Sequence, residues 1–205
     1  MLPRGYPQVP MPFKVRVAPY VVLLVVVLGV LDDHGVIDLG GGGGAATPHH
    51  RPAHRPPVAA PAGPAGIPAG YLRVYRHAGA GEAWPDLRTG RRYAAWAVLA
   101  GIGKAESDHG RSAAPGVRSG LNRAGCCAGP MQFNLHDGPP STWARYGRGS
   151  VYDPADAIPA AARKLRADGA RSDVRAALFA YNHAGWYVAE ILALAGRYQA
   201  NGGGR

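Results

Sequence analysis

Hydrophobic residues recur at intervals of three and four along the second half of the chain, which places them on one face of a helix. Five such faces follow one another from Ile67 onward. Their residues are, in order, Ile67, Tyr71, Val74, Tyr75, Ala78; Trp96, Leu99, Gly103, Glu106; Ile158, Ala162, Leu165; Val174, Leu178, Tyr181; and Val188, Ile191, Leu192, Ala195. We therefore predict a mostly α-helical domain.

Helix ends and gaps add detail to this pattern. Asp153 followed by Pro154 and Asp156 predicts an N-cap, a first-turn proline and an acid in the first turn. Ser172 or Asp173 caps the next helix. Residues 110–135 lack a helical period and are rich in Gly, Ser, Pro and Asn, so we expect an irregular loop insert there, with at most a small turn or hairpin.

The first third has a different pattern. Residues 1–19 carry basic but no acidic side chains, and an apolar run over residues 20–31 follows. This order is typical of a secretory signal, while residues 15–31 form a marginal membrane anchor interrupted by Arg16 and Pro19. The sequence leaves a cleaved signal and a retained anchor both open, and a buried core strand is disfavoured. Either interpretation places the domain outside the cytoplasm, in the cell envelope or secreted.

A linker separates this segment from the domain. Its Gly, Ala, Pro and His composition offers almost no large apolar side chain to bury. Its histidines His49, His50 and His54 are better explained as a polar spacer than as metal ligands. The predicted organisation is a signal or anchor over 1–35, a linker over 36–66, the folded domain over 67–200 and a tail over 201–205.

Net charge limits which kinds of partner are expected, and the cysteines limit which crosslinks are. The 205 residues carry 23 Lys and Arg against 13 Asp and Glu, a net charge of +10, which favours an anionic partner. The basic residues form no long block and no nucleic-acid motif, so sequence-specific DNA binding is disfavoured, and an anionic cell-wall polymer fits the charge equally well. Cys126 and Cys127 are adjacent; two small apolar thiols are the favoured interpretation, with a vicinal or intermolecular disulfide as alternatives.

Glu106 is the candidate catalytic group. It shares a predicted helix face with Trp96 and Leu99 and lies near the negative end of the helix dipole. Apolar burial and negative potential both disfavour a carboxylate, so we expect a raised pKa and a carboxylic acid that is protonated at rest. The alternative is that Glu106 is a structural surface acid paired with Lys104 or His109.

Two later motifs favour a catalytic Glu106 over a paired surface acid. Glu106-Ser107 is followed by G-P-M-Q-F at residues 129–133 and by A-Y-N at residues 180–182. In this order the chain resembles the catalytic domain of lytic transglycosylases, goose-lysozyme-like enzymes that cleave peptidoglycan. I-P-A-G-Y-L-R-V-Y, S-T-W-A-R-Y-G and Y-D-P-A-D-A-I-P-A-A-A-R-K-L are similar to its actinobacterial branch, and the likeness covers about residues 67–198.

The resemblance implies a lysozyme-like, mostly α (α+β) fold and cleavage of the MurNAc–GlcNAc β-1,4 bond with formation of a 1,6-anhydromuramic end. Glu106 would act as acid and then as base. The substrate-binding residues that it implies are Ser107, Met131, Gln132, Phe133, Tyr181 and Asn182, with Ser107 mainly holding the helix end. It implies no metal and no cofactor, and we expect a monomer whose partner is the glycan strand.

Alternatives remain open at this stage. No convincing second carboxylate emerges from Asp108, Asp137, Asp153 and Asp156, which favours a single-acid mechanism over a hydrolytic muramidase. A non-catalytic wall-binding domain and an accessory enzyme for another machine are further alternatives. A Ser-His-Asp triad from residues 107–109 is disfavoured because neighbours in one segment rarely converge. The long insert leaves Ser112, Ser119 and Asn122 as candidates for contacting the N-acetyl group, and Pro130 replaces a common leucine.

Overall fold

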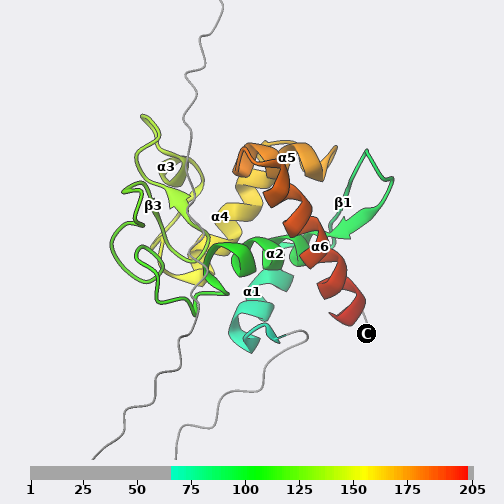
Figure 1. Cartoon of the computed structure of the whole chain (residues 1–205), viewed down its shortest axis with the longest axis horizontal. Helices are drawn as coiled ribbons and strands as arrows, with labels where there is room; N and C mark the ends of the chain where they lie inside the picture. Colours follow the sequence, from blue (N-terminus) through cyan, green and yellow to red (C-terminus); the bar gives the residue numbers. More distant parts are fainter. Residues whose placement is uncertain (1–65, 203–205) are drawn as a thin grey trace, which may run out of the picture. The chain divides into compact units, whose positions relative to one another are not determined.

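The computed structural model describes residues 66–202, all within one unit (Figure 1). Its elements are α1 Ala69–Ala78, β1 Ala83–Pro85, β2 Arg92–Ala94, α2 Ala95–Ser107, β3 Cys127–Ala128, β4 Phe133–Asn134, α3 Thr142–Tyr146, α4 Pro154–Ala167, α5 Val174–Tyr181 and α6 Gly185–Gly202. The predicted signal or anchor and all of the linker except Gly66 lie outside the described residues.

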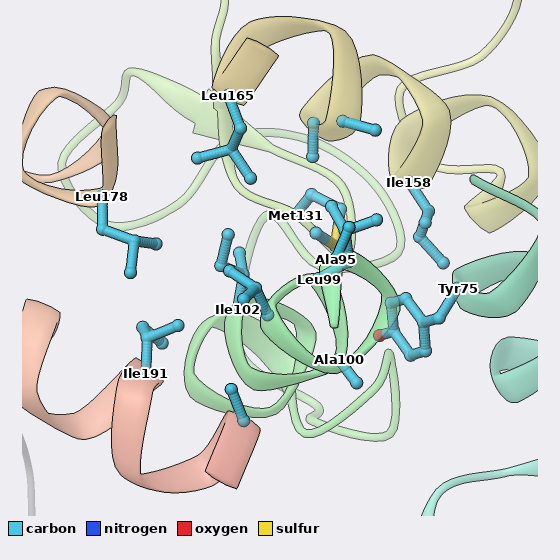
Figure 2. Close-up of a cluster of buried hydrophobic side chains, with 14 of the residues drawn as sticks. Tyr75, Ala95, Leu99, Ala100, Ile102, Met131, Ile158, Leu165, Leu178 and Ile191 are labelled. Carbon is cyan, nitrogen blue, oxygen red and sulfur yellow. The ribbon is translucent and has the colours of Figure 1, made fainter. Parts of the chain in front are cut away.

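Helix α2 lies at the centre, packed mainly against α6 and also against α1 and α4 (Figure 1). Its residues 97–103 are all buried, which explains why this segment is apolar around its whole circumference. The core side chains around it come from every other long helix and from the β3–β4 turn, as Figure 2 shows for Tyr75, Leu99, Ile102, Met131, Ile158, Leu165, Leu178 and Ile191. The site that concerns function is built at the C-terminal end of this central helix.

Helix α1 approaches α2 closely at one glycine. A Cβ on Gly103 would collide with the hydroxyl of Tyr75, a fully buried residue of α1. The missing side chain therefore lets a tyrosine hydroxyl enter the core beside α2, where it needs a hydrogen-bond partner. His109 supplies that partner, at 3.1 Å from the Tyr75 hydroxyl.

Two predicted helix starts are confirmed. The Asp153 carboxylate accepts a hydrogen bond of 2.8 Å from the Ala155 amide, with Pro154 at the first helical position of α4. Asp173, the second of the two candidates, caps α5 by accepting from the Arg175 amide at 3.1 Å. In both helices the buried residues include those that the period selected, such as Ile158 and Leu178.

The antiparallel hairpin β1–β2 was not predicted. It pairs Trp84 with Tyr93, and each strand has only three residues, too few for an alternation to stand out. Its turn is held by the buried Asp86, whose carboxylate accepts two hydrogen bonds, of 3.1 and 2.8 Å, from the Arg175 guanidinium of α5. Long-range ion pairing, which has no local sequence signal, therefore fixes this element.

Three further details differ from or agree with the prediction. The short helix α3, capped by Ser141, was missed, and α6 continues through Gly202, two residues into the predicted tail 201–205. The insert does contain a small hairpin, β3–β4. Helices account for about half of residues 66–202 and the strands there are few and short, so the mostly α prediction is confirmed for this part of the chain. Within residues 66–202 no helix is long and apolar enough to cross a membrane.

Candidate functional site

Glu106 lies in the last turn of α2 and is partly buried. Its Oε1 accepts a hydrogen bond of 2.7 Å from the hydroxyl of Tyr187, a buried residue of α6. No buried side-chain oxygen or nitrogen in residues 66–202 lacks a partner, and this part of the chain supplies none for Oε2. One carboxyl oxygen is therefore held by the protein while the other stays open to solvent.

The pKa of Glu106 is raised from 4.5 to about 7. Burial is the largest cause, since it removes water from the charged form; the Tyr187 hydrogen bond opposes it, and the negative charge of Glu190 adds to it. This is the direction expected from the sequence, but the surroundings differ. The sequence placed Trp96 and Leu99 beside the acid, whereas its direct contact is a tyrosine hydroxyl from α6.

Ser107 connects the end of α2 to a distant turn. Its hydroxyl donates to the Pro130 carbonyl at 2.8 Å and accepts from the Gly110 amide at 2.8 Å. The side chain is buried, with 2% of its surface exposed. Its contacts match the expected structural part, which is to fix where the helix carrying Glu106 ends.

The Gly-Pro-Met-Gln segment is the turn of the hairpin β3–β4. Gly129 has φ +79°, and a Cβ there would collide with the Val151 carbonyl oxygen, so glycine is required. Gln132 also has a positive φ, of 47°, and its side-chain amide donates to the Gly129 carbonyl at 2.8 Å and accepts from Asn122 at 3.2 Å. The turn is therefore held rigid by its own amide groups.

Two residues of this turn differ from the expectation. Met131 and Phe133 were predicted to bind substrate, yet Met131 is 0% exposed and Phe133 2% exposed. Figure 2 shows Met131 among the core side chains, and the Phe133 ring packs edge-on against Trp143 at 5.3 Å. Both side chains fix the turn from inside, because an apolar side chain gains more from the core than from solvent.

Tyr181 ties the third motif to the second. Its hydroxyl donates to the Met131 carbonyl at 2.8 Å, directly after the carbonyl that Ser107 holds. Asn182 follows as the C-cap of α5 and is partly buried. The structure thus brings the three separated motifs into contact through two successive carbonyl groups of one turn.

The adjacent cysteines form a vicinal disulfide, Cys126–Cys127, so the favoured interpretation of two free thiols was wrong. The tight turn before β3 brings the two side chains together. The Asn122 side-chain oxygen accepts from both cysteine amides, at 3.3 and 3.4 Å, while its amide contacts Gln132.

Ser112, Ser119 and Asn122 were left open as candidates for contacting the N-acetyl group. Among them, Asn122 is the one that hydrogen-bonds to the Met-Gln turn. The Ser112 hydroxyl instead accepts from the Ala114 amide at 3.1 Å.

The aspartates considered as second acids have other partners. Asp108 is paired with Lys104 and Arg111, which lower its pKa to about 2. Asp137 binds Thr142, and Asp156 accepts from the Ser150 amide at 2.8 Å. The carboxylate that the sequence search missed is Glu190, which is exposed on α6 one turn beyond Tyr187. The sequence shows that Tyr187 and Glu190 are three residues apart and so lie on one helix face. Only the packing of α6 on α2 brings that face to Glu106.

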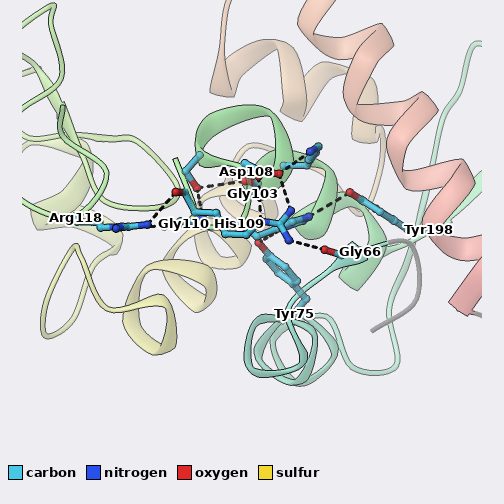
Figure 3. A network of polar contacts seen from close by, with 11 residues as sticks. Gly66, Tyr75, Gly103, Asp108, His109, Gly110, Arg118 and Tyr198 are labelled. Atoms are coloured by element: carbon cyan, nitrogen blue, oxygen red, sulfur yellow. Dashed lines mark hydrogen bonds and ion pairs between the residues drawn. The ribbon is translucent and has the colours of Figure 1, made fainter. Parts of the chain in front are cut away.

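His109 lies in the polar network at the C-terminal end of α2 (Figure 3). Its ring is 1% exposed, with Nδ1 3.1 Å from the Tyr75 hydroxyl and Nε2 3.3 Å from that of Tyr198. Burial, followed by the charge of Arg111, lowers its pKa from 6.5 to about 4. Since His109 and Ser107 face different partners, residues 107–109 form no Ser-His-Asp triad.

What the site offers chemically is one proton donor of near-neutral pKa at the end of a buried helix. No group of three or more His, Cys, Asp or Glu in residues 66–202 is arranged to hold a metal ion. Searches of protein-family models, of curated proteins and of solved structures find no match to this chain. The function is therefore inferred from the motifs and from the geometry of the site.

Proposed function

We propose that this protein is a peptidoglycan lytic transglycosylase with a lysozyme-like catalytic domain, which cleaves the MurNAc–GlcNAc β-1,4 bond outside the cytoplasm. The observation that carries the proposal is the Glu106 carboxyl, which has a pKa of about 7, one oxygen bound to Tyr187 and the other open to solvent. The contact between the three motifs through the Met-Gln turn supports it.

In the first step the neutral Glu106 donates its proton to the glycosidic oxygen, and the bond from that oxygen to the anomeric carbon breaks. The substrate's own N-acetyl group stabilises the cationic carbon. A pKa near neutrality suits this step, because the acid is substantially protonated yet still gives up its proton. The Tyr187 hydroxyl then stabilises the carboxylate that remains by donating to Oε1.

In the second step the Glu106 carboxylate takes the proton of the sugar's C6 hydroxyl, and that oxygen bonds to the anomeric carbon. The product carries a 1,6-anhydro ring, no water is consumed, and Glu106 regains its proton. This scheme needs one carboxyl group, in agreement with the ion-paired or hydrogen-bonded state of the aspartates named above.

A hydrolytic muramidase is the second candidate, and Glu190 is the observation that favours it. Its negative charge acts on Glu106, so it is the nearest equivalent of a second carboxylate that could activate water. A third alternative, a wall-binding domain without activity, would leave the raised pKa of Glu106 without a purpose.

The test is mass spectrometry of the fragments that the full-length chain releases from purified peptidoglycan, beside its Glu106→Gln and Glu190→Gln variants. The proposal expects fragments lighter by one water than hydrolysed ones, absent with Glu106→Gln and retained with Glu190→Gln. Hydrated reducing ends that disappear in both variants would establish the muramidase instead. No cleavage by the unaltered chain would leave the binding domain.

A further inference from the structure

The junction of α5 and α6 exposes three aromatic side chains, Phe179, His183 and Trp186, which we call the aromatic corner. Phe179 is 48% exposed and Trp186 53% exposed. Among the described residues the only other exposed large hydrophobic side chain is Leu87, in the β1–β2 turn. Single exposed apolar residues are common, but Trp186 directly precedes Tyr187, which binds the candidate acid, and this position suggests a binding surface.

Trp186 is linked to the acid through its neighbour Tyr187. The Trp186 ring packs edge-on against Tyr187, with centroids 5.9 Å apart and planes at 81°, and Tyr187 donates to Glu106. The Phe179 ring packs against His183 in the same way, at 5.5 Å. The contact with Tyr187 covers one edge of Trp186 and leaves ring surface open, which is a prerequisite for a stacking platform.

A carboxylate lies on the same exposed side. Glu190 follows Trp186 by four residues on α6, so the two exposed side chains are neighbours on the helix surface. A pyranose ring combines an apolar face of C–H groups with hydroxyl donors around its edge. An open indole face beside a carboxylate matches both parts, because the indole covers the C–H face and the carboxylate accepts from the hydroxyls.

We propose that Trp186 is the stacking platform for a sugar ring next to the scissile bond, with Glu190 accepting hydrogen bonds from that sugar. The inference that the ring belongs to a glycan strand rests on the function proposed above. Trp186 is then a specificity-determining residue that binds ground state and transition state alike. Its loss should weaken binding and leave the chemical step intact.

The binding test uses the full-length Glu106→Gln chain, which should not turn over substrate, and the trisaccharide of N-acetylglucosamine as probe. The chain has four tryptophans, and Trp84 is buried while Trp96 and Trp143 are partly buried, so Trp186 should dominate a change in fluorescence. We expect saturable quenching in the parent, and isothermal titration calorimetry, which does not depend on the tryptophan signal, should show that binding is lost when Trp186→Ala is added. Absence of binding, or equal binding without Trp186, would overturn the platform.

The kinetic test compares Trp186→Ala, Trp186→Phe and Leu87→Ala in peptidoglycan cleavage. We expect Trp186→Ala to raise KM about tenfold with kcat within about twofold, Trp186→Phe to restore much of the loss, and Leu87→Ala to have no effect. Thermal unfolding of each variant checks the fold. A KM that does not move would refute the platform.

The two tests separate this inference from the proposed function. Trp186-dependent binding of the trisaccharide by a chain that makes no anhydro ends would support the platform and refute the transglycosylase. Anhydro ends made equally well by Trp186→Ala would refute the platform and support the transglycosylase.

Discussion

At the scale of single residues, the protonation of Glu106 is decided by neighbours far away in sequence. Burial raises its pKa, the Tyr187 hydroxyl lowers it, and Glu190 raises it again. Ser107 and His109 are both buried and engaged elsewhere, so neither competes for a role in chemistry. A partly buried acid with a raised pKa is suited to proton transfer, but it destabilises the fold whenever it is ionised.

Replacing Glu106 with Gln should therefore stabilise the fold at alkaline pH. The folded pKa of about 7 lies above the ordinary 4.5, so the carboxyl's contribution to stability falls as pH rises from 4.5 and levels off above 7. The variant should gain up to about 3 kcal/mol in unfolding free energy at alkaline pH and show little difference at acidic pH. Urea unfolding at the two pH values measures this; Asp108→Asn, whose ion pairs are lost, should show no gain.

At the scale of elements, the β3–β4 turn acts as a connector. Its Pro130 and Met131 carbonyls are bound by Ser107 from the end of α2 and by Tyr181 from α5, while Gly129 passes against the Val151 backbone. The turn thereby relates the helix that carries the acid to the helix that leads into the aromatic corner. A substitution that moves the turn should therefore shift the position of Glu106, although it makes no direct contact with that residue.

Gly129→Ala should lower both stability and activity. The new Cβ must displace the Val151 backbone, and φ +79° strains any side chain, so we expect a loss of about 2–4 kcal/mol in unfolding free energy and a clear drop in kcat. Gly120→Ala is the matched control, since Gly120 has φ +62° but open space around its Cβ position. Equal losses in both variants would show that strain alone matters and that the close contact does not.

At the scale of the whole described unit, His109 joins three helices. It follows α2 and lies between Tyr75 of α1 and Tyr198 of α6, with Arg111, Asp108 and Lys104 as the charged groups that act on it. Its pKa of about 4 lies below the ordinary 6.5, so the unfolded chain binds the proton more readily. Its contribution to stability is complete above pH 6.5 and is lost as pH falls toward 4.

In the Glu106→Gln background, which removes the opposing titration, the unfolding free energy should therefore fall by up to about 3 kcal/mol on acidification through that range. Adding His109→Asn, which suits the positive φ of 55° at this position, should flatten the dependence. It should also lower stability at neutral pH, because two buried tyrosine hydroxyls lose their partner. An unchanged acid dependence in the double variant would assign the effect to other groups.

The sequence by itself determined what is local. The helical periods from Ile67 to Ala195, the caps Asp153 and Asp173 and the glycine turn before Met131 all depend on neighbours within a few residues, and each was predictable. So was the candidate acid at the end of an apolar helix. The hairpin β1–β2 was not, because its strands are too short to show a period and Asp86 is held by Arg175, far along the chain.

Only the tertiary structure decided which side chains meet. It placed Tyr187 rather than Trp96 beside Glu106, turned Met131 and Phe133 into the core, and left Phe179, His183 and Trp186 exposed at the junction of α5 and α6. The physical reason is that a helix period states which face is buried but not which helix covers it. The packing of α6 on α2 makes that choice, and with it sets the pKa and the surroundings of the candidate acid.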